Sequence, residues 1–385
     1  MRLALVACAL AACVDTNPPI TGTQSLKVTL TSPASGGSVS QRLPDAARAV
    51  TMSITAIDAD NNPDASFNNT LQVYVHFLGT LSPYLGEMPL ATVPMSGGHG
   101  TLAITLPPVF GPTTVWLDDG ADPNATYATG ISDTLWYRDP FVADIETPVD
   151  EMAINALSAG PLDNKNIAVV NSRYGANGRL VVTSVFSQGY TLADVNCANA
   201  QGAPPCVSAN YDYVEVFSFS APLDQDKRFI SEGQVIDGFA GGVTEFDGLT
   251  EIGFPQTFVA GDPVIDKARE PVAALFDPTW FMNTIMFERN EGGAIEIHNA
   301  KVCPLDSDYV TFKQWKIDPA GVADPATCAG KSVLNVISTS VGELDPATLA
   351  GKVVPRVVGM LRPINIGSFN VWIIYPRSMA DLTIN

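Results

Sequence analysis

Apolar and polar residues alternate strictly along several short stretches in the first part of the chain. The clearest stretch puts four apolar side chains on one face: Leu71, Val73, Val75 and Phe77. Comparable alternation runs through residues 27–31, 50–55, 102–106 and 113–117, with clusters of Gly, Pro, Asn and Asp between the stretches. A period of two is typical of strands that bury one face. The pattern therefore predicts at least five short strands between residues 25 and 145.

These strands and one of their loops resemble a known architecture. One strand ends in an Asx-rich loop, residues 58–64, before the next strand begins at Leu71, as in bacterial immunoglobulin-like domains. The resemblance covers residues 25–145. This segment lacks the Cys–Trp–Cys arrangement of antibody domains. It implies an N-terminal Ig-like β-sandwich, which we expect to act as a spacer. Residues 146–166, with their Pro, Gly and Asx residues, are interpreted as a linker.

The region after this linker contains a repeat with a shift of 121 positions. Residues 238–255 and 359–376 both begin with Gly, pass through a turn and end in an aromatic residue and Pro, without a gap. In the first copy the turn is Asp247-Gly248, a strong hairpin signal that sets Val243 opposite Ile252. Two cysteines precede each copy. The combination favours duplicated domains, at residues 167–292 and 293–385.

Each half has an opening strand, a cysteine-bearing loop, a middle strand at 213–219 or 333–338, and a closing hairpin. About five strands with one long hairpin resemble the oligonucleotide/oligosaccharide-binding (OB) barrel. The last hairpin in particular resembles the closing strands of OB-like domains in exported bacterial proteins. The resemblance implies one or two OB-like β-barrels, so the expected fold is all-β. One short helix is predicted over residues 262–275, limited by Pro263 and Pro271.

The N-terminus has the pattern of an export signal. Arg2 precedes an apolar run that ends at Val14, which is too short to span a bilayer. The run includes four residues that resemble the lipobox of bacterial lipoproteins: Leu10, Ala11, Ala12 and Cys13. That resemblance implies a signal peptide at residues 1–12, lipid attachment at Cys13 and a tether at residues 13–24. A plain signal peptide with an incidental cysteine, or a buried apolar helix, is the alternative.

The lipobox, Ig-like and OB-like segments together resemble myxobacterial cell-envelope lipoproteins. This resemblance covers most of the chain, and its motifs are structural ones that carry no chemistry. It implies an exported protein that is anchored to the bacterial cell envelope by its N-terminal lipid, with the outer membrane as the expected location. The membrane is then a partner through the lipid.

Four cysteines follow the export signal and its lipobox: Cys197, Cys206, Cys303 and Cys328. In an exported chain this number most simply means two disulfides, with three pairings open. The alternatives are a zinc site or free buried thiols, and the spacings do not suit zinc. If each repeated half is an independent barrel, the repeat selects the local bridges, Cys197–Cys206 and Cys303–Cys328.

The charge of the chain bears on its partners. Its 385 residues include 40 Asp and Glu against 21 Lys and Arg, which gives a net charge of −19. Phosphate binding requires a basic surface, so we expect no nucleic-acid partner. A hydrophobic content of 46% is enough to bury cores, so the chain as a whole is not expected to be disordered.

Histidine offers little evidence for catalysis. The chain has three: His76 and His99 lie in the expected sandwich, and His298 lies in the expected second barrel. The strand pattern places His76 on an exposed face, His99 in a glycine-rich turn and His298 at a strand end. No Gly-x-Ser-x-Gly motif accompanies them. We therefore interpret the three as solvated side chains and assign no catalytic residue.

One loop has the spacing of a calcium site. Asp58, Asp60, Asn62 and Asp64 occupy every second position. An EF-hand would need Gly where the chain has Pro63, and Glu where it has Asn69. An Asx-rich hairpin loop is the preferred interpretation, with weak Ca²⁺ binding as the alternative and no other cofactor expected. A second acidic loop, residues 118–124, has the same two interpretations.

Two further groups of residues are candidate sites. Glu245 and Glu251 flank the predicted hairpin turn, and we expect them to be solvated. A set of aromatic residues could form either a barrel core or a stacking platform: Tyr211, Tyr213, Phe217, Phe219 and Trp372. The core is preferred. The expected function is non-catalytic binding or envelope architecture, with a glycan or a protein as ligand. The alternative is an envelope hydrolase that uses carboxylates or bound Ca²⁺ in the C-terminal region.

Overall fold

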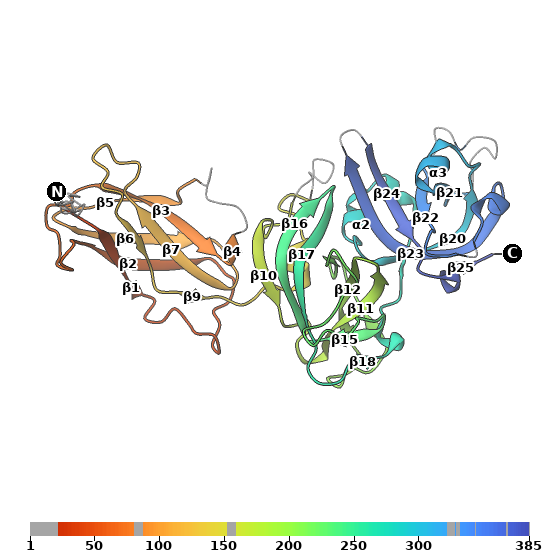
Figure 1. Ribbon diagram of the computed structural model, residues 1–385, viewed down its shortest axis with the longest axis horizontal. Helices are drawn as coiled ribbons and strands as arrows, with labels where there is room; N and C mark the ends of the chain where they lie inside the picture. Colours follow the sequence, from red (N-terminus) through yellow and green to blue (C-terminus); the bar gives the residue numbers. More distant parts are fainter. Residues whose placement is uncertain are drawn as a thin grey trace, which may run out of the picture. The chain divides into compact units, whose positions relative to one another are not determined.

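The computed structural model describes residues 22–80, 88–151, 159–321, 328, 332–342, 344–366 and 369–384. It is nearly all β, which confirms the predicted fold class (Figure 1). The chain divides into two compact units. The first holds the described residues up to 77 and from 88 to 137, and the second holds residues 78–80 and the described residues from 138 onward. The lipobox, residues 10–13, lies outside the described part of the chain.

The first unit is a β-sandwich. Its strands are β1 (Ser25–Ser32), β2 (Arg48–Ile57), β3 (Thr70–Phe77), β5 (Ala91–Pro94), β6 (His99–Leu106), β7 (Pro112–Asp118), β8 (Thr129–Ile131) and β9 (Leu135–Trp136). One layer contains β1, β2 and β6, the other β3, β5 and β7, and β8 pairs with both β1 and β7. The alternation prediction is confirmed, because Met52, Leu71 and Val73 are fully buried in the core between the layers.

The second unit begins with a sheet of ten strands. Its members are β4 (Gly79–Thr80), β10 (Lys165–Val169), β11 (Gly178–Phe186), β12 (Gly189–Cys197), β13 (Cys206–Val207), β14 (Tyr213–Phe217), β15 (Gln234–Ile236), β16 (Gly238–Phe246), β17 (Leu249–Phe258) and β18 (Val264–Ile265). Five of these run in the order β11-β12-β14-β17-β16, with β14 parallel to β17. Val243 lies opposite Ile252 in the β16–β17 hairpin, as the Asp247-Gly248 turn predicts.

The third sheet repeats this order and closes it. Its strands are β19 (Ala274–Leu275), β20 (Ala294–Val302), β21 (Gln314–Asp318), β22 (Leu334–Ile337), β23 (Val353–Ile366), β24 (Phe369–Tyr375) and β25 (Leu382–Thr383). The order is β20-β21-β22-β24-β23, β22 is parallel to β24, and β23 pairs back to β20. The ten-stranded sheet is the first barrel, and β11 and β16 are its counterparts of β20 and β23. These two strands do not pair with each other, because β11 pairs with β15 and β16 pairs with β10. The first barrel is therefore open and the second closed.

Helices are few and short. They are α1 (Val142–Glu146), α2 (Ile285–Glu288) and α3 (Ser307–Phe312), with 3₁₀ turns at Gly175–Asn177, Lys267–Arg269, Pro278–Phe281, Pro346–Leu349 and Met379–Asp381. The predicted helix over residues 262–275 is wrong. That segment contains β18, one 3₁₀ turn and β19, because Pro263 and Pro271 lack the amide hydrogens that a helix needs and the chain pairs with sheet edges. None of the helices in the described ranges is long and apolar enough to cross a membrane.

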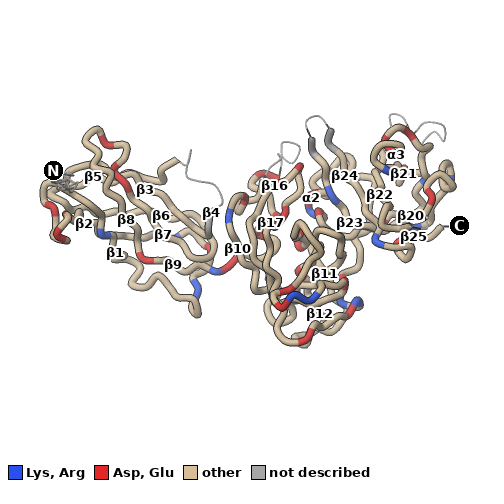
Figure 2. Tube along the Cα trace, in the orientation of Figure 1, with Lys and Arg blue, Asp and Glu red and all other residues tan. Residues whose placement is uncertain are grey.

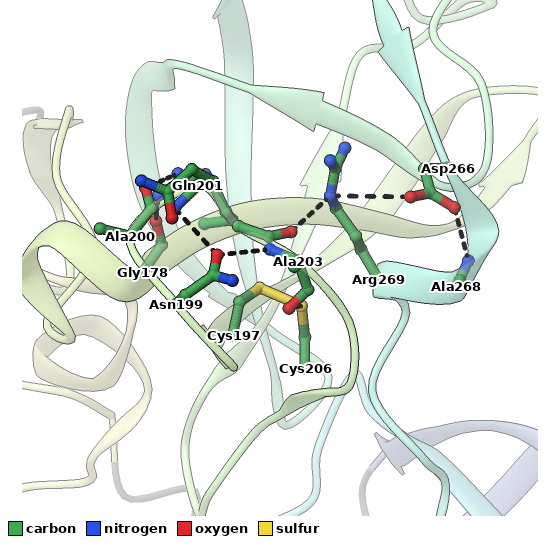
Figure 3. The surroundings of a disulfide bond; sticks show 12 residues. Gly178, Cys197, Asn199, Ala200, Gln201, Ala203, Cys206, Asp266, Ala268 and Arg269 are labelled. Atoms are coloured by element: carbon green, nitrogen blue, oxygen red, sulfur yellow. Dashed lines mark hydrogen bonds and ion pairs between the residues drawn. A yellow bond between two sulfur atoms is a disulfide. The ribbon is translucent and has the colours of Figure 1, made fainter.

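Both predicted local disulfides are present. Cys197 pairs with Cys206, and Cys303 pairs with Cys328. Figure 3 shows the first bridge and the loop that it closes, in which the Asn199 side chain accepts hydrogen bonds from the backbone amides of Gln201 and Ala203. Two disulfides are typical of proteins in oxidising compartments outside the cytoplasm.

The predicted linker, residues 146–166, is described only in part. Residues 152–158 lie outside the described ranges. Within the rest, Glu146 and Leu162 are buried, and Lys165 and Asn166 already belong to β10. The boundary between the two compact units falls between Tyr137 and Arg138.

Candidate functional site

A cavity of about 960 Å³ lies in the second unit, between the β16–β17 hairpin, the end of β14 and strand β23. Most of its wall is apolar or glycine: Phe217, Phe219, Gly241, Gly242, Phe246, Leu249, Gly253, Phe254, Pro363 and Ile364. Five polar residues complete it: Asn166, Thr244, Asp247, Glu251 and Arg362. A concave, mainly apolar cavity of this size with a few polar groups is the usual form of a ligand site.

Two phenylalanines of this wall adopt a backbone conformation that bulky residues normally avoid. Phe219 has a φ of 59° and Phe254 a φ of 51°. The left-handed region costs a bulky side chain on the order of 1–3 kcal/mol. Their rings are also exposed, Phe219 by 56% and Phe254 by 84%. Neither the local backbone nor burial accounts for phenylalanine here, and such strain commonly marks ligand sites.

A β-bulge turns Phe254 outward. The register of the hairpin shifts between Ala240, which lies opposite Gln256, and Gly242, which lies opposite Gly253. Two residues of β17, Phe254 and Pro255, therefore oppose one residue of β16. That residue is Gly241, where an added Cβ would lie 2.6 Å from the Ile252 side chain. Glycine at this position permits the bulge, and the bulge re-aims the ring.

Three phenylalanines form a continuous aromatic shelf: Phe217, Phe219 and Phe254. Phe217 and Phe219 meet edge to face with their centroids 4.6 Å apart, and Phe219 and Phe254 lie 5.0 Å apart. Such ring pairs contribute about 0.5–1.5 kcal/mol beyond the area that they bury. The shelf joins the end of β14 to the bulge of β17 and forms one side of the cavity.

The polar side of the cavity is centred on Arg362 of β23. Its guanidinium lies 2.8 Å from the Glu215 carboxylate and 3.9 Å from that of Glu251. It also lies over the rings of Phe186, at 5.7 Å, and Tyr375, at 5.5 Å. Planar cations stack well on aromatic faces, so the rings and the carboxylates together fix the guanidinium.

Behind this wall lies a glutamate cluster: Glu146, Glu215, Glu245, Glu288 and Glu291. Glu146, Glu215 and Glu291 are buried, with exposures of 5%, 1% and 4%. Burial raises the pKa of Glu215 to about 7, that of Glu245 to about 6 and that of Glu288 to about 8. Burial, reinforced by repulsion from neighbouring carboxylates, raises the pKa of Glu146 and Glu291 well above the ordinary value.

The hydrogen bonds of the cluster leave some oxygens without partners. Glu291 Oε1 accepts from the Thr250 amide at 2.8 Å, and Glu245 Oε2 accepts from the Thr250 hydroxyl at 3.0 Å. Glu146 Oε1 and Glu291 Oε2 accept no hydrogen bond from any described residue. Across the described ranges, no group of His, Cys, Asp and Glu side chains is arranged to hold a metal. Because burial raises the pKa of these carboxyls, they keep their protons to a higher pH than exposed carboxyls do.

The expectation that Glu245 and Glu251 are solvated is wrong. Glu245 is half-buried, and the Glu251 side chain is only 13% exposed. Burial raises the pKa of both carboxyls. The hairpin is covered by segments distant in sequence, including β23 through Arg362. No local pattern in the hairpin could have revealed that cover.

The aromatic set divides between core and surface. Tyr211 and Tyr213 are buried, as the core interpretation predicts. Trp372 is half-buried and stacks on Phe287 with centroids 5.4 Å apart. Phe219 departs from the prediction, because β14 ends at Phe217 and the chain turns the Phe219 ring into the shelf. Phe254, the other end of the shelf, was missed, and its neighbouring Gly and Pro were the signal available.

The three histidines lie in different surroundings. His99 and His298 are exposed, and they contact Thr55 and Glu296 respectively. His76 is half-buried and stacks on Trp116 at 5.8 Å. None of them lines the cavity.

The acidic loops of the sandwich bind their own backbone. Asp58 Oδ1 accepts from the amides of Asp60 and Asn62, at 2.9 and 2.8 Å. Asp64 accepts from the Ser66 amide and hydroxyl and from the hydroxyl of Thr23. These are the hydrogen bonds of an Asx-rich turn, in which the carboxylates satisfy loop donors. In the second acidic loop, Asp119 likewise accepts from Asn69 and Thr126.

Comparisons with known proteins give little. No family model matches the chain, and no curated protein matches it. Among solved structures, dimeric latent PorU from Porphyromonas gingivalis aligns over 92% of this chain and 34% of its own, with 9% identity and a TM-score of 0.20. The chain thus spans about a third of the length of that protein.

Proposed function

We propose that the protein is an exported, lipid-anchored binding module of the bacterial envelope and that the cavity of the second unit is its ligand site. One observation carries the proposal: Phe219 and Phe254 are exposed beside the cavity in a strained backbone conformation. An exposed aromatic ring held at a conformational cost is best explained by a ligand that covers it. The sandwich, in this account, is a spacer.

The wall of the cavity favours a protein over a glycan as the ligand. A sugar presents many hydroxyl groups, and each one left without a hydrogen bond on burial is costly. The lining offers few polar groups. Among them, Arg362 already interacts with both Glu215 and Glu251. Apolar side chains of a protein segment suit the phenylalanine-rich wall better.

Binding of a neutral, environment-sensitive fluorescent dye to the full chain tests the proposal. Phe254→Ala and Phe219→Ala should each weaken dye binding by about tenfold to a hundredfold, because a buried phenyl ring contributes on the order of 1.5–3 kcal/mol. Phe229→Ala is the matched control, since Phe229 is 72% exposed and does not line the cavity. Equal affinities in all four proteins would refute the cavity as the ligand site.

The alternative, an envelope hydrolase, has one observation in its favour. Glu251 lines the cavity, and burial raises the pKa of its carboxyl, as is common for a general acid. The apolar lining and the proximity of Arg362 to Glu251 speak for binding. Turnover of an envelope polymer that is abolished in Glu251→Gln would favour the hydrolase instead.

A further inference from the structure

The cavity is charged as well as apolar, and its charges do not cancel. Two carboxylates line it, Asp247 and Glu251, and Arg362 is the one cation among the lining residues that the structure describes. Arg362 is shared between Glu215 and Glu251. Asp247 forms no ion pair within the described part of the chain. The polar side of the cavity is therefore net negative.

An anionic ligand group would meet a double penalty at this wall. It would be repelled by Asp247 and Glu251, and it would compete with Glu215 for Arg362. The Glu215 side chain is fully buried, so its ionised form would lose the one cation that it faces in the interior. Separating a buried pair is strongly unfavourable.

The aromatic shelf adds attraction for a cation. The faces of phenyl rings carry partial negative charge, and a cation within about 6 Å of a ring centroid is attracted to it. Phe219 and Phe254 present exposed rings beside the same cavity that Asp247 and Glu251 line. Rings and carboxylates thus favour the same kind of group.

We infer that the cavity binds a segment of a partner protein that joins apolar side chains to a Lys or Arg. The apolar side chains occupy the phenylalanine-lined space, and the cation lies between the carboxylates and the rings. This inference rests on the proposed function, because it names the chemistry of the ligand for the same site.

Displacement of the neutral dye from the full chain by three short peptides tests the inference. The peptides share one apolar sequence and carry Lys, Gln or Glu at the centre. We expect the Lys peptide to bind about tenfold more tightly than the Glu peptide at low salt, with the Gln peptide between them, and added salt to narrow the ratio.

Two variants locate the preference. Asp247→Asn retains a favoured hairpin turn, since Asn-Gly suits it as well as Asp-Gly does, and Glu251→Gln retains the size of the side chain. Each should reduce the ratio of Lys to Glu peptide affinity several-fold. Asp226→Asn, which removes an exposed charge outside the cavity, should leave the ratio unchanged.

The outcomes separate this inference from the proposed function. A Glu peptide that displaces the dye as well as the Lys peptide does, or a ratio that neither cavity variant alters, would overturn the cationic preference alone. Failure of the dye to bind in a manner that depends on Phe254 would overturn the proposed function and this inference together.

Discussion

Phe219 and Phe254 keep a backbone conformation that Gly or Asn would adopt more easily. Sequence reasoning placed Phe219 in a strand over residues 213–219, but it could not foresee that β14 ends at Phe217 and that Phe219 adopts a left-handed conformation. Phe254 was equally hidden, because its orientation depends on a bulge that forms only when β16 and β17 pair. The burial of Glu245 and Glu251 likewise arises from segments distant in sequence. The site could be predicted only as a set of aromatic residues and carboxylates, without its geometry.

The buried carboxyls make stability depend on pH in an unusual direction. Burial raises the pKa of Glu215 from 4.5 to about 7, so the folded state holds a proton that the unfolded state has lost between these values. The proton on Glu215 therefore adds roughly 3 kcal/mol to the free energy of unfolding below pH 4.5. This contribution is lost as the pH rises through 7.

Glu215→Gln should make this profile less steep, because the amide stays neutral at every pH while the other buried glutamates still titrate. The measurement is the free energy of unfolding by urea at several pH values from 4.5 to 8, with Asp226→Asn as the control for an exposed carboxylate. A wild-type protein that is most stable at pH 8, or a Glu215→Gln profile as steep as the wild type, would show that the carboxyl is not perturbed as described.

Strands were the most predictable elements. Alternating residues foretold the buried faces of β2, β3 and β6, and the Asp247-Gly248 turn foretold the register of its hairpin. The repeat foretold the disulfide pairing. Periodicity alone could not show that residues 262–275 do not form a helix. Pairing with β15 and β20 decides the conformation of that segment. Whether a barrel closes was also hidden, since it depends on which strands pair at its edges: β23 pairs with β20 in the second barrel, whereas β10 and β15 pair with the edges of the first.

The two disulfides stabilise the barrels by reducing the conformational entropy of the unfolded chain. Cys197 and Cys206 are 9 residues apart, and Cys303 and Cys328 are 25 apart. In the chain-entropy model each contributes about 3 kcal/mol, with the longer loop contributing more. Double Cys→Ser variants of each pair should lower the free energy of unfolding accordingly. A larger loss from the Cys197–Cys206 pair would show that the loop interactions in Figure 3, and not chain entropy, dominate.

At the scale of the whole molecule, the dominant feature is its negative charge. Acidic residues outnumber basic ones along the chain, as Figure 2 shows, and this charge agrees with the cationic partner inferred for the second unit. Composition gives the sign of the net charge. It could not predict the cavity, because the wall draws on β14, on the β16–β17 hairpin and on β23, which are separated by long stretches of chain.

Lipid attachment at Cys13 would anchor the whole molecule to a membrane. Palmitate supplied to an expressing bacterium should label the wild type and not Cys13→Ser, because the proposal makes the Cys13 thiol the acceptor of the lipid. External protease applied to intact cells then separates a surface location from one inside the envelope. Label retained in Cys13→Ser would show that Cys13 is not the attachment site and would remove the argument for a lipid anchor.

The central claim is that the cavity of the second unit is where this protein meets its ligand. Hydrogen exchange of the full chain, with and without the Lys peptide, tests it most directly. We predict slower exchange in residues 213–219 and 241–254, which carry the shelf and the bulge, and unchanged exchange in β25. Protection confined to the sandwich or to the closed barrel, with none in these two segments, would contradict the account.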